Sequence, residues 1–190
     1  MEARCAELGM NVYMADLSVD QPAEQHERFH FTKKFVGVTS NDEFITLDQW
    51  VEDNEGRSGE DLLLQIDIEG FEYEVFLAAS DQLMARFRII VAEFHRLDQL
   101  WAKPFFGFAS RVFEKILQTH HCVHAHPNNW RGTVKKGDIE IPINMEFTFL
   151  RKDRIGNFTY VDKYPHPLDV DNVPSMSTLD LPSCWYRSAK

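Results

Sequence analysis

The sequence predicts an α/β domain built on a doubly wound, mainly parallel sheet with an antiparallel edge. Residues 62–66 form an apolar run and residues 87–95 form a second one with polar groups at its end, which is typical of strands buried on both faces. A helical pattern lies between them, and this strand–helix–strand alternation indicates parallel pairing. Residues 143–150 alternate with period two and follow another strand without an intervening helix, which favours an antiparallel edge.

The size and composition fit a folded, acidic domain. The chain has 190 residues, of which 44 % are hydrophobic, and a net charge of −10. This acidity argues against broad nucleic-acid binding, which needs a basic face. The three cysteines contain no CxxC pair, which argues against a thiolate zinc site and favours a reducing compartment. With no signal peptide and no membrane-length apolar run in view, we expect a cytoplasmic protein that does not enter a membrane.

The elements expected before the first buried strand are short. In chain order they are the end of a helix (residues 1–8), two strands (11–16 and 29–38), a short helix (47–52) and a loop (53–60). Gly9 is a typical helix stop, and Thr46 is a typical helix cap. The first of the two strands ends in an acid, Asp16.

From the first buried strand onward, strands and helices alternate. We expect strands over residues 62–66, 87–95, 121–126 and 143–150, helices over residues 71–78 and 104–117, and a linker or hairpin arm over residues 133–141. In the first helix, Phe71, Val75 and Ala78 share a face, with Glu72 and Glu74 turned away. Periodicity stops after residue 151, so we expect a domain over residues 1–151 and an irregular tail over residues 152–190.

Polar side chains gather where the strands end. They are Asp16; Asp67 with Glu69; Glu93 with His95; and His126 with Asn128 and Asn129. Because parallel strands end at one edge of a sheet, these groups are expected to converge there. Such a cluster could bind a divalent metal, supply a general base that a carboxylate orients, or bind a polyhydroxyl substrate.

Each of these residues also has a structural interpretation. Asp67 could cap the helix that follows it. Glu93 and His95 lie two apart on a strand and could pair with each other. Asn128 and Asn129 follow a proline and are common turn formers. Three further histidines show no convincing metal-ligand spacing and are expected to be structural: His120, His121 and His124.

The acidic motif resembles a known family. Residues 66–72, Ile-Asp-Ile-Glu-Gly-Phe-Glu, followed by Val-Ala-Glu-Phe-His at 91–95, resemble the FkbM family of S-adenosylmethionine-dependent methyltransferases. Residues 124–129 and 145–151 are similar to that family's last strands, and the resemblance covers roughly residues 9–151. It implies a Rossmann-like fold and methyl transfer to a hydroxyl oxygen of a sugar or similar small molecule.

The resemblance also implies roles for individual residues. Asp16 matches the acid that holds the cofactor ribose hydroxyls, and Asp67 is a second expected cofactor contact. We expect His95 to be the general base and Glu93 to orient it. Alternatively, Asp67 could hold a divalent metal that acidifies the substrate hydroxyl. We assign no residue as a ligand of a permanently bound metal. The expected substrate contacts are Glu69, His126, Asn128 and Asn129.

One feature of the family has no counterpart among these residues. The family's first strand and glycine-rich turn should precede residues 1–8, and that turn lets the backbone approach the cofactor. We therefore expect an N-terminally truncated domain that binds S-adenosylmethionine weakly and whose open sheet edges allow homo-oligomers. Two other functions stay open: a non-catalytic binding module of methyltransferase fold, and a metal-dependent hydrolase.

Overall fold

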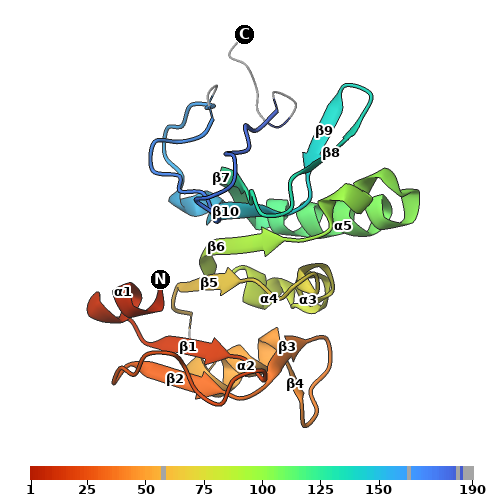
Figure 1. The fold of residues 1–190 in the computed structure, drawn as a ribbon. Coiled ribbons are helices and arrows are strands. Elements are labelled where there is room, and N and C mark those ends of the chain that lie inside the picture. Colours follow the sequence, from red (N-terminus) through yellow and green to blue (C-terminus); the bar gives the residue numbers. More distant parts are fainter. Residues whose placement is uncertain (57–58, 162–163, 183–184, 186–190) are drawn as a thin grey trace. The chain divides into compact units, whose positions relative to one another are not determined.

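The chain divides into two compact units (Figure 1). The computed structural model describes residues 1–56, 59–161, 164–182 and 185. The first unit is Met1–Gly59 with Ala78–Ser80, and the second is Glu60–Leu77 with Asp81–Lys190. Arg57 and Ser58 of the expected loop, and Cys184, lie outside the described residues. Across the described part of the chain, no helix combines the length and the apolar character that crossing a bilayer requires.

The first unit contains two small parallel sheets. Its elements are α1 (Glu2–Glu7), β1 (Val12–Ala15), β2 (Phe29–Thr32), β3 (Phe35–Gly37), β4 (Phe44–Thr46) and α2 (Leu47–Glu55). Strand β1 pairs with β2, and β3 pairs with β4. Thr46 caps α2 as expected, because its hydroxyl accepts a hydrogen bond from the Gln49 N–H at 3.3 Å.

The strand expected over residues 29–38 is two strands in two different sheets. A tight turn separates them, in which the Lys34 N–H donates to the Thr32 carbonyl at 2.8 Å. The run of β-forming residues hides this break, because residues of the same kind occur on both sides of the two lysines. Strand β4, which pairs with β3, was not predicted.

The second unit contains a four-stranded sheet, its helices and a hairpin. Its elements are β5 (Leu62–Ile66), α3 (Glu72–Ala78), α4 (Asp81–Met84), β6 (Phe87–Phe94), η1 (Leu97–Trp101), α5 (Lys103–Thr119), β7 (His120–Pro127), β8 (Thr133–Lys136), β9 (Ile139–Pro142), β10 (Met145–Arg151) and η2 (Lys152–Arg154). The expected hairpin arm is the antiparallel pair of β8 and β9. The short helix α4 was not predicted.

The order of the main sheet is β5-β6-β10-β7. Strands β5 and β6 are adjacent and parallel, as predicted, but β5 is an end strand of this sheet and not a central one. Strand β10 is antiparallel to both β6 and β7. The reversed strand therefore lies inside the sheet instead of at the expected antiparallel edge, which makes the sheet mixed. The α/β class is confirmed.

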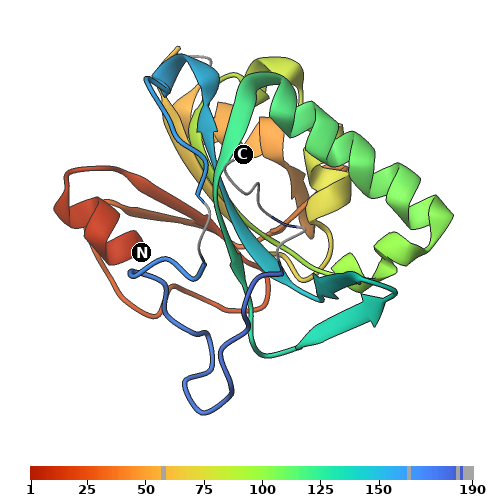
Figure 2. The same cartoon turned by 90° about the horizontal axis from the view of Figure 1, so that it is seen from above.

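Helix α5 lies along one face of this sheet (Figure 2). Its Phe113 ring packs 4.7 Å from Phe94 of β6 and 5.7 Å from Phe147 of β10, measured between ring centroids. Phe94 also stacks on Phe76 of α3. The alternation of the strands then turns their intervening residues, such as Glu93, toward the opposite face. That face is polar.

Helix α3 buries a different face from the one predicted. Phe71, expected in the core, is 57 % exposed, whereas Glu72, expected to face solvent, is 0 % exposed. Tyr73 and Phe76 supply the apolar contacts instead, and Tyr73 packs against Phe94 and Phe105. Hydrogen bonds from backbone N–H groups to its carboxylate explain the burial of Glu72.

Candidate functional site

A row of polar side chains crosses the polar face of the main sheet. Glu146 of β10 pairs in register with Glu93 of β6 on one side and with His126 of β7 on the other. Asp67 directly follows Ile66, whose partner is Ala92, so Asp67 is level with Glu93. The sheet thus brings together Asp67, Glu93 and His126 in one row, as their positions at the strand ends predict.

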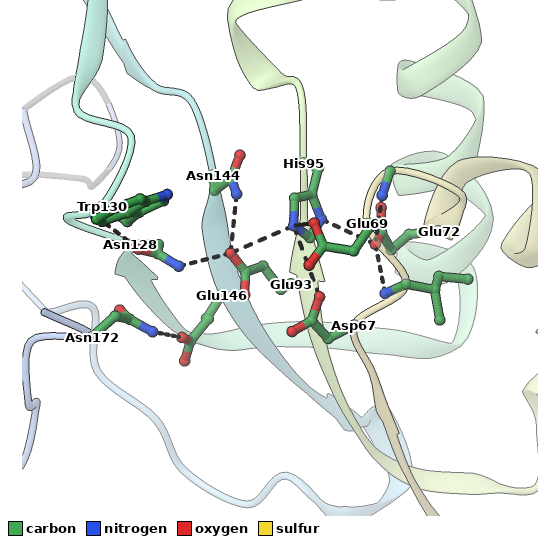
Figure 3. A network of polar contacts seen from close by, with 12 residues as sticks. Asp67, Glu69, Glu72, Glu93, His95, Asn128, Trp130, Asn144, Glu146 and Asn172 are labelled. Atoms are coloured by element: carbon green, nitrogen blue, oxygen red, sulfur yellow. Dashed lines mark hydrogen bonds and ion pairs between the residues drawn. The ribbon is translucent and has the colours of Figure 1, made fainter. Parts of the chain in front are cut away.

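His95 occupies the end of β6, beside this row (Figure 3). Its Nδ1 lies 3.1 Å from Oε1 of the fully buried Glu72. Its backbone carbonyl accepts a hydrogen bond from the Tyr73 hydroxyl at 2.7 Å. The imidazole is only 8 % exposed, so two residues of α3 fix both its backbone and its ring.

The loop after β5 explains why Glu72 is buried. Oε1 of Glu72 accepts hydrogen bonds from the backbone N–H groups of Ile68 (3.0 Å) and Gly70 (3.1 Å). Glu69 between them has φ +57°, a left-handed conformation that is uncommon for a residue with a side chain. Such strain persists where surrounding contacts determine it, and it concentrates at functional sites.

The backbone conformation of Gly70 favours glycine, and the side chain of Arg96 packs closely against it. It has φ +104°, and a Cβ at this position would lie 2.9 Å from Nε of Arg96. Arg96, which follows His95, is itself left-handed with φ +61°. Residues with left-handed backbone conformations therefore follow both β5 and β6, close to His95.

The other nitrogen of His95 faces carboxylates. Three oxygens surround Nε2, which are Oε2 of Glu69 at 3.4 Å, Oδ1 of Asp67 at 3.8 Å and Oε1 of Glu93 at 3.8 Å. Asp67 and Glu69 are exposed, and Glu93 is largely covered. Nδ1 is thus held by a buried acid, whereas Nε2 is directed toward groups that a ligand could reach.

These neighbours shift the pKa values of the cluster. Burial would lower the pKa of His95, but the hydrogen bond and charge of Glu72 outweigh it, so the pKa is raised. Burial would raise the pKa of Glu72, but hydrogen bonds from His95 and the loop N–H groups leave it lowered. Burial and the charge of Glu93 raise the pKa of Asp67 to about 6. Glu72 therefore favours the charged form of His95, whereas Asp67 takes up a proton at a higher pH than an ordinary aspartate.

Amide side chains hold Glu93 in place. Its Oε1 accepts hydrogen bonds from Nδ2 of Asn128 at 2.9 Å and Nδ2 of Asn144 at 3.2 Å. Oδ1 of Asn128 in turn accepts from the backbone N–H of Trp130, whose side chain is 61 % exposed. Figure 3 shows Trp130 and Asn128 at the end of this chain of contacts that begins at His95.

Two of the expected substrate contacts are engaged by the C-terminal segment, residues 164–182. The amide of Asn129 is buried, donates to the carbonyls of Val173 and Ser177, and accepts from the Val173 N–H. His126 is buried and faces Asp169. This segment therefore lies against the β7 side of the polar face.

Asp16, the expected ribose contact, belongs to the first unit. Its Oδ1 accepts hydrogen bonds from the backbone N–H and the hydroxyl of Ser18, both at 2.7 Å. The aspartate thus stabilises its own turn after β1.

Part of this cluster could hold a cation. Asp67, Glu72 and His95 each offer one ligand atom, and these atoms lie within 4.8 Å of one another. The second oxygen of Glu72, Oε2, is buried without a hydrogen-bond partner in the described structure. A bound cation or water would give this carboxylate oxygen the partner that it lacks.

Sequence reasoning missed two residues of this site. Glu72 was placed on the solvent side of α3, and Asn144 was not considered. A signal for Glu72 existed, since a carboxylate placed just after a glycine turn can accept the free N–H groups at a helix start. For Asn144 the sequence offers no comparable signal, because its contact with Glu93 depends on sheet register.

A scan of family models finds one that covers most of the chain. The model for the methyltransferase FkbM domain matches residues 7–122. The match includes Asp67, Glu69, Glu72, Glu93 and His95, and it ends before His126. No curated protein and no solved structure matches the chain.

Proposed function

This chain belongs to the methyltransferase FkbM domain family, and on that premise we propose that its site belongs to a methyltransferase that acts on a hydroxyl oxygen of a sugar or similar small molecule. The observation that supports this proposal is the placement of His95. Its Nδ1 is fixed by the buried Glu72, and its Nε2 lies 3.4 Å from a carboxylate oxygen of the exposed Glu69. A general base for a substrate hydroxyl needs this combination of a held ring and an accessible nitrogen.

The proton of the substrate hydroxyl moves to Nε2 of His95. S-adenosylmethionine, when bound, would supply the methyl group for the substrate oxygen, with its positively charged sulfur as the leaving group and S-adenosylhomocysteine as the second product. Glu72 then stabilises the imidazolium that has formed, because their hydrogen bond gains charge. The raised pKa of His95 increases its affinity for that proton.

The charges of the site fit a cationic methyl donor. Asp67, Glu69 and Glu93 place three carboxylates around one nitrogen, which favours a positive group nearby. Asp67 is the member that would hold the cofactor, since it follows β5 directly and is exposed. Burial combined with like charges raises its pKa to about 6, and a cation beside it would oppose that shift.

Polar groups beside the base suit a polyhydroxyl substrate. Glu69 is 84 % exposed and can accept hydrogen bonds from neighbouring hydroxyls. Asn128 is held by Glu93, and the exposed ring of Trp130 follows it, so an amide and an apolar surface are available together. Sugars offer both hydroxyls and apolar C–H faces to such an arrangement.

The test is methyl transfer from labelled S-adenosylmethionine at millimolar concentration to a panel of sugars and other small alcohols. We expect a methylated product, and we expect His95→Ala and Asp67→Asn each to reduce its rate by about a hundredfold. Glu74→Gln, on the exposed side of α3, is the matched control and should keep the wild-type rate. A folded protein that yields no product, or product that His95→Ala leaves unchanged, contradicts the proposal.

A divalent cation is a second candidate for the same site, because Asp67, Glu72 and His95 can share an ion and Oε2 of Glu72 lacks a partner. A cation there would acidify a bound hydroxyl or water, as in a metal-dependent hydrolase or a metal-assisted transferase. The two mechanisms differ in their response to chelation. Activity that is lost in EDTA and restored by Mg²⁺ or Mn²⁺ favours the cation, whereas activity that survives EDTA favours His95 as the base.

A further inference from the structure

A second cluster of histidines lies on β7, apart from His95. His124 and His126 are two residues apart on the strand, and they pair in register with Thr148 and Glu146 of β10. Residues at this spacing on a strand share a face. The C-terminal segment brings Asp169 to the same face.

Asp169 reaches both imidazoles with separate oxygens. Its Oδ1 lies 2.9 Å from Nε2 of His124, and its Oδ2 lies 3.6 Å from Nδ1 of His126. Oδ2 also accepts a hydrogen bond from the backbone N–H of His166 at 2.8 Å. Asp169 is itself largely covered, with 10 % of its side chain exposed.

His126 is the unusual member of this cluster. It is only 8 % exposed, and neither of its ring nitrogens has a hydrogen-bond partner in the described structure. Buried polar atoms are nearly always satisfied by protein, water or an ion. The gap of 3.6 Å to Asp169 is too long for a hydrogen bond, and it suits two groups that bind to a third between them.

The donor types fit a zinc ion, and Asp169 lies about as far from each histidine nitrogen as neighbouring zinc ligands lie from one another. Imidazole nitrogens with a carboxylate oxygen are common zinc ligands, at about 2.0–2.2 Å from the metal. In a tetrahedral site, such bond lengths separate neighbouring ligand atoms by about 3.4 Å. Imidazole is a poor ligand for Mg²⁺ or Ca²⁺, which prefer oxygen donors, so this pair of histidines favours a transition metal.

A fourth donor is close to the cluster. The ring of His166 lies 6.1 Å from the ring of His124, measured between centroids. Nδ1 of His166 accepts a hydrogen bond from the Leu168 N–H, so Nε2 is the nitrogen that could turn toward a cation. All four residues lie outside the matched residues 7–122 of the family model.

We propose that His124 and His126 of β7, with Asp169 and His166 of the C-terminal segment, form a zinc site that fastens this segment to the sheet. Zinc binding draws the two imidazoles and the carboxylate toward one point and gives one of the two ring nitrogens of His126 a partner. The hydrogen bonds of Asn129 to Val173 and Ser177 hold the next part of the same segment, so the two attachments reinforce each other.

The experiment is calorimetric titration of the metal-free chain with ZnCl₂, together with Co²⁺ absorption spectra that report tetrahedral coordination. We expect one equivalent of Zn²⁺ at this site. Loss of a neighbour that merely supports a ligand costs 10–100-fold in affinity, so His124→Ala/His126→Ala should lose about a hundredfold or more. Bound Zn²⁺ should also raise the melting temperature of the wild type but not of this variant.

Two control variants assign the signal to this site. His121→Ala alters an exposed histidine of the same strand and should keep the affinity. His95→Gln should also keep it, and this separates the zinc site from the Asp67, Glu72 and His95 group. If the double variant does not fold, Asp169→Asn with an unchanged circular dichroism spectrum gives the same comparison. Absence of Zn²⁺ binding, undiminished binding in the double variant, or loss only in His95→Gln would overturn the proposal.

Discussion

At the scale of single residues, the contact between His95 and Glu72 determines the chemistry of the site. An ionised carboxylate without solvent is costly unless several donors compensate it. Oε1 of Glu72 has three donors, the N–H groups of Ile68 and Gly70 and Nδ1 of His95. The acid can therefore stay charged inside the protein and stabilise the imidazolium that forms when His95 takes up a proton.

The first prediction concerns the pKa of His95. In Glu72→Gln the hydrogen bond and charge that raise this pKa are lost, while burial, which lowers it, remains. We expect the pKa to fall below the ordinary value of about 6.5. An NMR titration of the His95 ring, assigned with His95→Gln, measures it. Glu69→Gln, which changes an 84 % exposed side chain, is the control and should shift the pKa less. An unchanged pKa in Glu72→Gln would show that another group sets it.

The second prediction concerns stability against pH. The lowered pKa of Glu72 gives stability that is present above about pH 4.3 and is lost as pH falls through its folded value. The raised pKa of His95 gives stability that is full below about pH 6.5 and is lost as pH rises through its folded value. Both contributions to stability are therefore present together between about pH 4.3 and about pH 6.5.

Urea unfolding of the wild type and Glu72→Gln across pH measures this window. We expect the difference in unfolding free energy to reach about 1–3 kcal/mol at pH 5–6, the cost of losing a buried hydrogen-bonded partner. The difference should shrink toward pH 9 and toward pH 3. A difference that is constant from pH 3 to pH 9 would mean that the pair is not ionised in the folded protein.

Much of this residue-level site could be predicted, and the rest has physical reasons for being missed. Asp67, Glu93 and His95 were expected together because strand ends converge, and the register brings them together. Glu72 was misplaced because a charged residue in an amphipathic pattern is usually solvated. Its burial depends on backbone donors in a left-handed turn, which no periodicity reveals.

At the scale of elements, the loop between β5 and α3 is the feature most sensitive to substitution. Gly70 combines φ +104° with the close approach of Arg96. Gly107 offers a contrast, because it lies within α5 and a Cβ there would meet nothing within 4 Å. Replacement by alanine should therefore have opposite effects on stability at these two glycines.

The third prediction uses this pair. Gly70→Ala should destabilise the protein by more than about 1 kcal/mol, since alanine resists positive φ and its methyl group displaces Arg96. Gly107→Ala should stabilise it by about 0.5–1 kcal/mol, as expected when alanine replaces glycine inside a helix. Thermal unfolding of both variants measures the effect. Equal effects of the two substitutions would contradict the role given to the turn.

Strand types were easier to predict than strand partners. The strands β5 and β6 were recognised by their apolar composition, although burial on both faces was expected and Leu63 and Gln65 of β5 are exposed. The position of β10 between β6 and β7 could not be inferred, since the hydrophobic alternation of a strand is the same at an edge and inside a sheet.

At the scale of the whole molecule, the fourth prediction concerns the cofactor. The 190 residues contain no Gly-x-Gly sequence, and such a turn normally lets the backbone approach the methionine end of S-adenosylmethionine. We expect this chain to bind the cofactor with a dissociation constant weaker than about 1 mM, which is less than about 4 kcal/mol of binding free energy. Calorimetry measures it, and a micromolar constant would show that another loop replaces the turn.

The order of the main sheet also constrains how the chain can fold. Strand β10 fills the space between β6 and β7, and its Met145 pairs with Phe94, far earlier in the sequence. Such distant pairing slows folding, because a long loop must close before any contact rewards it. During synthesis, β6 and β7 emerge before the strand that joins them, and each then presents an unpaired edge. Until β10 takes its place, β6 and β7 each keep an edge with which a strand of another chain could pair.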